Sequence, residues 1–64
     1  MEEHAIVETV LDIYREGHYI PEGTSGTIVH ISQSGKNCIV EFSTIKNNPV
    51  ISVHPEEITE ITED

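Results

Sequence analysis

The sequence has a single cysteine, no tryptophan and no long apolar run. Cys38 therefore has no partner for a disulfide within the chain. The first ten residues, MEEHAIVETV, lack the basic start and the apolar stretch of a secretory signal, and no segment approaches the length of a membrane span. These absences predict a cytoplasmic protein that does not associate with a membrane.

Basic residues are also scarce. Three Lys and Arg stand against twelve Asp and Glu, which gives a formal net charge of -9. A protein that binds nucleic acid through its phosphates commonly makes about 6–10 such contacts, so this sequence predicts no nucleic-acid binding. The acids gather at the two ends, with five in residues 1–16 and five in residues 56–64. A protein partner with a basic surface suits this charge.

The chain is well supplied with Val and Ile, which are spread over several segments. A chain of 64 residues makes one domain, close to the smallest size that a hydrophobic core stabilises without disulfides or metal. We therefore expect a single domain over residues 1–64, with an ordered core at about residues 5–61.

The first apolar segment, residues 6–13 (IVETVLDI), alternates in the manner of a strand. A helix competes, because Ala5, Thr9 and Ile13 are spaced by four, but β-branched residues disfavour it. Residues 14–21 (YREGHYIP) are polar and interrupted, and they predict a loop.

Two of the four glycines, Gly23 and Gly26, stand three residues apart before a β-branched run. The tripeptide Pro-Glu-Gly that ends at Gly23 predicts a turn, because proline presets one dihedral angle and glycine accepts positive φ. Gly26 predicts a bulge or a close approach of another part of the backbone.

A strand at residues 27–31 follows, and the loop SQSGK turns the chain back. Side chains of a strand alternate between its two faces. We expect Val29 and Ile31 to face inward, and Ile28 and His30 to face outward.

Two further strands are predicted at residues 38–42 and 50–53. Pro55, followed by acids, favours one helical turn, and a short strand at residues 59–62 follows it. Five short strands, tight connections and one helical turn before the last strand are typical of an all-β fold, and specifically of a small five-stranded SH3-like barrel.

Three stretches, IPEGTSGTIVHI, CIVEF and ISVHPEEI, resemble a small bacterial family known as domain of unknown function 4926. Its members are similar in having a glycine turn into a strand, a VEF strand and a closing proline-acidic turn. The resemblance covers about residues 6–61, and it implies an SH3-like fold without a known activity, catalytic residue or cofactor. Ser25 and the stretch TIKNNPVIS depart from the family pattern.

The glycine turn also resembles the KOW motif. KOW modules that bind RNA usually have basic residues around this turn, whereas here Glu22 and His30 flank it.

Few residues are candidates for catalysis or metal binding. Cys38 alternates with Val40 and Phe42 on one face of its strand, which predicts a buried structural thiol rather than a nucleophile. The four histidines lack metal-binding spacing, and the acid pairs EE at positions 2–3 and 56–57 fit solvated charge. We predict no catalytic residue, no cofactor and no metal.

The stretch best suited to binding a partner contains Tyr14, Arg15, His18 and Tyr19. Aromatic residues and arginine are enriched at interface hot spots, and loops commonly carry binding residues. The alternative is that Tyr14 and Tyr19 only cover one end of a barrel that is too small to close itself.

These features favour a non-enzymatic, acidic protein-binding module. Two alternatives stay open. One is an antitoxin or immunity-type inhibitor, or a nucleic-acid mimic, whose carboxylates occupy a basic active site. The other is an accessory subunit of a larger enzyme or redox complex. Residues 50–53 are also a candidate strand edge for pairing across a homodimer axis.

Overall fold

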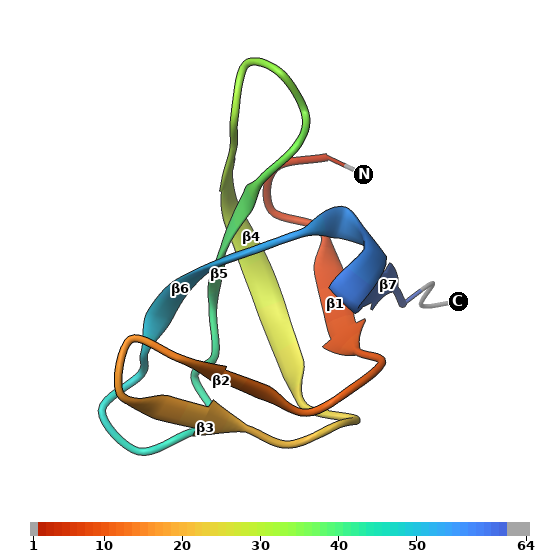
Figure 1. The fold of residues 1–64 in the computed structure, drawn as a ribbon. Coiled ribbons are helices and arrows are strands. Elements are labelled where there is room, and N and C mark those ends of the chain that lie inside the picture. Colours follow the sequence, from red (N-terminus) through yellow and green to blue (C-terminus); the bar gives the residue numbers. More distant parts are fainter. Residues whose placement is uncertain (1, 62–64) are drawn as a thin grey trace.

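The computed structural model describes residues 2–61, which form short strands and one turn of 3-10 helix (Figure 1). In chain order the elements are β1 (Ile6–Thr9), β2 (Ile13–Arg15), β3 (His18–Ile20), β4 (Ser25–Ile31), β5 (Cys38–Glu41), β6 (Val50–Val53), η1 (Pro55–Glu57) and β7 (Ile58–Glu60). The predicted all-β class is confirmed.

Five of the strands form one antiparallel sheet in the order β6-β5-β4-β1-β7. The other two, β2 and β3, pair with each other in a separate hairpin. After β6 the chain crosses to the opposite edge of the sheet, passes through η1 and continues as β7 beside β1 (Figure 1). Within residues 2–61 the two edges, β6 and β7, are not paired with each other. The sheet of these five strands is therefore open, whereas the sequence predicts a small five-stranded SH3-like barrel.

The core combines side chains from the sheet with side chains from the hairpin. Its buried hydrophobic residues are Val7, Ile13, Ile20, Ile28, Cys38, Val40, Phe42, Ile51, Val53 and Ile58. The expected common face of Cys38, Val40 and Phe42 is confirmed, since all three are at most 2% exposed. The predicted strand at residues 50–53 is also confirmed.

The loop predicted at residues 14–21 is wrong, because most of this stretch forms the β2–β3 hairpin. Two residues connect its strands, Glu16 with φ 54° and Gly17 with φ 78°. Positive φ at both positions is the requirement of the tight hairpin turn whose twist matches that of the strands. A glutamate rarely adopts this conformation, so the turn was not evident from the residue types.

The strand predicted at residues 6–13 is divided in two. β1 stops at Thr9, and the next strand begins at Ile13. The Thr9 hydroxyl donates a hydrogen bond to the Pro21 carbonyl at 2.8 Å and accepts one from the Thr24 N–H at 3.0 Å. This buried hydroxyl ties the end of β1 to the turn that precedes β4, and the chain leaves the sheet at that point.

The prediction of which β4 side chains point toward the core is wrong in the middle of the strand. Ile28 is fully buried, whereas Val29 is 39% exposed. The register with β5 shifts between Ile28 and His30, so the strand carries one extra residue at Val29. Such a bulge breaks the period-two alternation. Beyond it, Ile31 packs against the core and His30 is exposed, as expected.

The helical turn predicted after Pro55 is confirmed as η1, with Pro55 as its first residue. The last strand comes earlier than expected. β7 spans Ile58–Glu60, and it begins with the buried Ile58. Thr62, which ends the predicted strand, lies outside the described residues.

Gly26 lies in β4 beside the end of β5, and its missing side chain lets Val40 and Phe42 pack close to the backbone of β4. A Cβ at this position would lie 2.6 Å from Val40 Cγ1, 2.9 Å from Phe42 Cδ1 and 3.0 Å from the Glu41 carbonyl oxygen. Val40 and Phe42 are both fully buried, so neither has room to give way. The close approach at Gly26 is thus made mainly by two core side chains, with one backbone atom, the Glu41 carbonyl oxygen, beside them. The bulge in β4 lies at Val29 and not at Gly26.

We expect Gly26→Ala to lower the free energy of unfolding by about 1–3 kcal/mol, because the added methyl group overpacks the core. Urea denaturation measures the change. Ser25→Ala is the matched control, since Ser25 precedes Gly26 in the same strand and is exposed; it should change stability by less than about 0.5 kcal/mol. Equal stability of the two variants would contradict the close packing around Gly26.

Candidate functional site

The β2–β3 hairpin presents two aromatic rings to solvent. Tyr14 and Tyr19 are directly opposite each other in the hairpin register. Their rings are stacked, with centroids 4.4 Å apart and planes inclined by 25°. Tyr14 is 77% exposed and Tyr19 is 44% exposed. The pair therefore adds little to the core and forms an aromatic surface, which we call the tyrosine pair.

The opposite face of the hairpin is anchored in the core. Ile13 and Ile20 are also directly opposite each other, and both are at most 2% exposed. Because side chains alternate along a strand, burial of these two isoleucines places the neighbouring Tyr14 and Tyr19 on the outer face. The orientation of the tyrosine pair thus follows from the anchoring of the hairpin.

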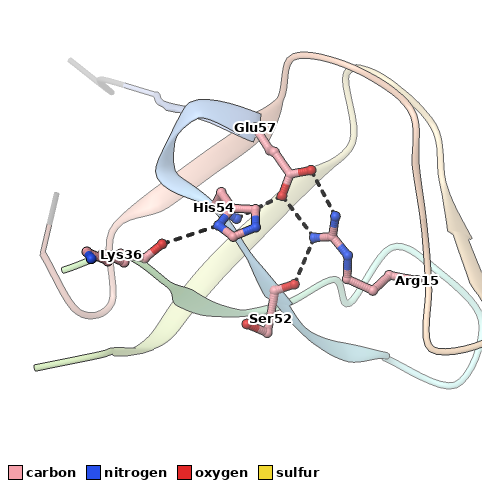
Figure 2. A network of polar contacts seen from close by, with 5 residues as sticks. All are labelled: Arg15, Lys36, Ser52, His54 and Glu57. Carbon is pink, nitrogen blue, oxygen red and sulfur yellow. Dashed lines mark hydrogen bonds and ion pairs between the residues drawn. The ribbon is translucent and has the colours of Figure 1, made fainter. Parts of the chain in front are cut away.

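Arg15 fixes the same hairpin through its guanidinium group. Nη1 and Nη2 donate to the two carboxylate oxygens of Glu57, at 2.9 and 3.0 Å. Nη1 also donates to the Ser52 carbonyl at 3.0 Å (Figure 2). Two-pronged pairing of arginine with a carboxylate is strong and directional. Arg15 therefore joins β2 to both β6 and η1, and we call this set of bonds the Arg15 latch.

Glu57 serves both the latch and its own helical turn. Its Oε1 accepts a hydrogen bond from the His54 N–H at 2.8 Å, and the Glu57 N–H donates to the His54 carbonyl at 2.9 Å. The hydrogen bond from Arg15 is the main cause that lowers the pKa of the Glu57 carboxyl, with the His54 backbone also contributing, while burial opposes the shift. The same hydrogen bond raises the pKa of Arg15.

The sequence-predicted binding residues thus lie together on one hairpin, but on different faces of it. Arg15 and His18 are opposite each other in the register and half-buried. With Glu16, Gly17 and the tyrosine pair they surround an open depression of about 390 Å³. Only the tyrosine pair is presented as a broad exposed surface.

Asp12 brings negative charge to the tyrosine pair. Burial, followed by the charge of the Asp12 carboxylate, raises the pKa of the Tyr19 hydroxyl. The carboxylate is held in place, because Asp12 Oδ1 accepts a hydrogen bond from the Glu22 N–H at 2.8 Å. This bond links the segment before β2 to the segment after β3.

A second open depression, of about 520 Å³, is lined by Lys36, Asn37, His54, Pro55 and Glu56. It is larger than the one at the hairpin. The one polar contact across it joins His54 Nδ1 to the Lys36 carbonyl oxygen at 3.4 Å (Figure 2), which is too long for a strong hydrogen bond. Its lining contains no tyrosine, whereas that of the hairpin depression contains both, and we therefore regard the hairpin as the better candidate site.

The cysteine and the possible metal ligands considered from the sequence do not form a second site among the described residues. The thiol of Cys38 is buried in the core. Among residues 2–61, no three His, Cys, Asp or Glu side chains gather in a way that could hold a metal ion. Over the same residues, no helix has the length and apolar character needed to cross a bilayer.

Comparisons of the chain with protein-family models, with curated proteins and with solved structures gave no match.

The sequence reading missed the partners of Arg15. Glu57 and Ser52 are 42 and 37 residues away from it along the chain, so no local pattern connects them. Part of the signal was nevertheless local. In a capping box, a glutamate accepts a hydrogen bond from the backbone N–H of the residue three positions before it, which is the residue that precedes the helical turn. His54 and Glu57 have this spacing.

We expect Glu57→Gln to lower the free energy of unfolding by about 1–2 kcal/mol, because it weakens the charged hydrogen bonds to a guanidinium that is itself partly exposed. Urea denaturation near neutral pH measures the change. Glu56→Gln removes the same charge from the exposed neighbouring position in η1, and it should leave stability nearly unchanged. If the two variants were equally destabilised, overall charge rather than the latch would be responsible.

The latch also predicts a pH dependence. Since the folded-state pKa of Glu57 is lowered from its ordinary value of 4.5, the stabilisation it gives is fully present above pH 4.5 and is lost as the pH falls through the folded-state value. The stability difference between the wild-type protein and Glu57→Gln should therefore shrink on acidification. Denaturant unfolding of both proteins, followed from neutral pH to about pH 3, tests this, and a constant difference would contradict it.

Proposed function

We propose that this protein is a non-enzymatic, acidic binding module that docks on a protein partner with a basic surface through the β2–β3 hairpin. The observation that carries this proposal is the tyrosine pair, which is stacked, exposed and mounted on an anchored hairpin. Large aromatic side chains supply much of the binding energy at protein interfaces.

The anchoring of the hairpin supports a binding role. Association costs free energy whenever side chains and loops must become ordered. Here Ile13 and Ile20 are buried on the inner face, and Arg15 bonds both Glu57 and the Ser52 carbonyl. The hairpin is therefore fixed before a partner arrives, which reduces that cost.

The charge of the chain supports a basic partner. A formal net charge of -9 attracts positively charged surfaces, speeds association and makes it sensitive to salt. Of the three Lys and Arg residues, Arg15 is paired internally with Glu57. The surface of the hairpin thus offers little positive charge that would repel a basic partner.

We further propose that the sheet and hairpin together form a small SH3-like barrel that is left open between β6 and β7. The support is the crossing of the chain from one sheet edge to the other through a single short turn, together with the hairpin anchored in the same core. Membership of the domain of unknown function 4926 family stays a proposal that rests on the sequence resemblance.

Affinity capture from a native lysate tests the binding role. We expect the wild-type protein to retain a stoichiometric basic partner at low salt and to lose it at high salt. Tyr14→Thr combined with Tyr19→Thr should fail to retain this partner, because both rings are removed while β-propensity is kept. Circular dichroism establishes that the double variant is folded.

Val29→Thr is the matched control for this experiment, since Val29 is an exposed apolar residue of β4, outside the hairpin. It should capture the partner as the wild-type protein does. Undiminished capture by the folded double tyrosine variant would show that the hairpin is not the docking surface. If the partner is a nuclease-like enzyme that the protein inhibits, the module acts as an inhibitor and not as an adaptor.

A further inference from the structure

The exposed rings of the tyrosine pair present π faces to solvent. Each ring covers one face of the other in the stack, and Tyr14 remains 77% exposed. The face of an aromatic ring is the negative part of its quadrupole and attracts cations. The outer face of Tyr14 is therefore the most accessible surface of this kind on the hairpin.

The charges around the pair reinforce this attraction. Asp12 precedes β2, Glu16 lies in the hairpin turn and Glu22 follows β3. Asp12 lies two residues before Tyr14 in the chain, and its charge contributes to the raised pKa of Tyr19. Arg15, the one Lys or Arg in residues 12–22, is paired with Glu57. The segment that carries the rings thus has three carboxylates against one arginine, and that arginine is already paired.

We infer that the tyrosine pair binds a cationic side chain of a basic protein segment, preferably an arginine, by cation–π stacking on Tyr14, with Asp12 nearby as the counter-charge. This inference rests on the proposed function and names the chemistry of the partner. An arginine fits better than a lysine, because its planar guanidinium stacks on a ring and also offers several N–H donors to a carboxylate.

The composition of the chain provides a direct readout. The sequence has two tyrosines and no tryptophan, so its tyrosine fluorescence comes entirely from the tyrosine pair and no tryptophan emission obscures it. The probe is a peptide of alternating arginine and glycine, which has no aromatic residue. The control is the same peptide with citrulline in place of arginine, because citrulline keeps the size and planarity of the side chain without its charge.

We expect the arginine peptide to change the tyrosine emission in a saturable manner. The citrulline peptide should produce no saturable change, and a lysine–glycine peptide should bind more weakly than the arginine peptide. Equal binding of the arginine and citrulline peptides by the wild-type protein would overturn the inference. So would the absence of binding by the arginine peptide at low salt.

Variants of the two tyrosines distinguish binding to the face of an aromatic ring from binding to any large apolar side chain. Titration calorimetry with the arginine peptide should give Tyr14→Phe/Tyr19→Phe an affinity within about two-fold of wild type, since phenylalanine keeps the ring face. Tyr14→Leu/Tyr19→Leu keeps apolar bulk without a ring, and it should bind about five- to thirty-fold more weakly. Wild-type affinity in the folded leucine variant would overturn the inference. If that variant does not fold, the lysine comparison still decides it, because the lysine and arginine peptides carry the same charge, and equal binding of the two would overturn the inference.

Asp12→Asn tests the counter-charge. Asparagine keeps an oxygen that can accept from the Glu22 N–H, so the hairpin should stay in place. We expect about two- to five-fold weaker binding of the arginine peptide and a smaller salt dependence. An affinity and salt dependence like those of the wild-type protein would remove Asp12 from the site.

Failure of this inference is distinguishable from failure of the proposed function. If lysate capture depends on both tyrosines while the arginine peptide does not bind, the hairpin is a docking surface of another chemistry. If capture does not depend on the tyrosines, the proposed function fails at its first step.

Discussion

The arrangement of this small domain depends on one guanidinium group. Arg15 links β2 to the Ser52 carbonyl of β6 and to the carboxylate of Glu57 in η1. The same carboxylate holds the N–H of His54, where the chain leaves β6. Within residues 2–61 the sheet edges β6 and β7 are not paired with each other. Side-chain hydrogen bonds therefore perform part of the joining that strand pairing performs in a closed barrel.

This joining determines what the hairpin presents to solvent. Ile13 and Ile20 anchor its inner face in the core, so the period of two along each strand directs Tyr14 and Tyr19 outward. The two-residue turn sets the register that places the rings opposite each other, and the rings stack. The tyrosine pair is thus the exposed half of a structural unit whose other half is buried. Its proposed role in binding depends on the rigidity that this arrangement supplies.

Much of the fold was predictable where hydrophobic alternation is unbroken, as in the strand that leads to Phe42. Prediction failed where one extra residue shifts the alternation of a strand, or where one residue adopts an unusual backbone conformation. The bulge at Val29 reverses the facing of part of β4, and the positive φ of Glu16 makes a hairpin from a polar stretch. At the candidate site, the sequence singled out Tyr14, Arg15, His18 and Tyr19 as a binding loop, but neither the hairpin nor the role of Arg15 was evident, because its partner Glu57 is 42 residues away. Such a contact arises from the tertiary structure and leaves no local pattern.

The most direct measurement of the central claim is NMR of the free protein, which reports both the stacking of the tyrosine pair and the rigidity of the hairpin. Our account predicts nuclear Overhauser contacts between the Tyr14 and Tyr19 rings. It also predicts backbone order parameters of about 0.85 over β2 and β3, as in rigid backbone. Order parameters below about 0.6 over these strands, with no contact between the rings, would contradict the claim that the hairpin is a fixed platform.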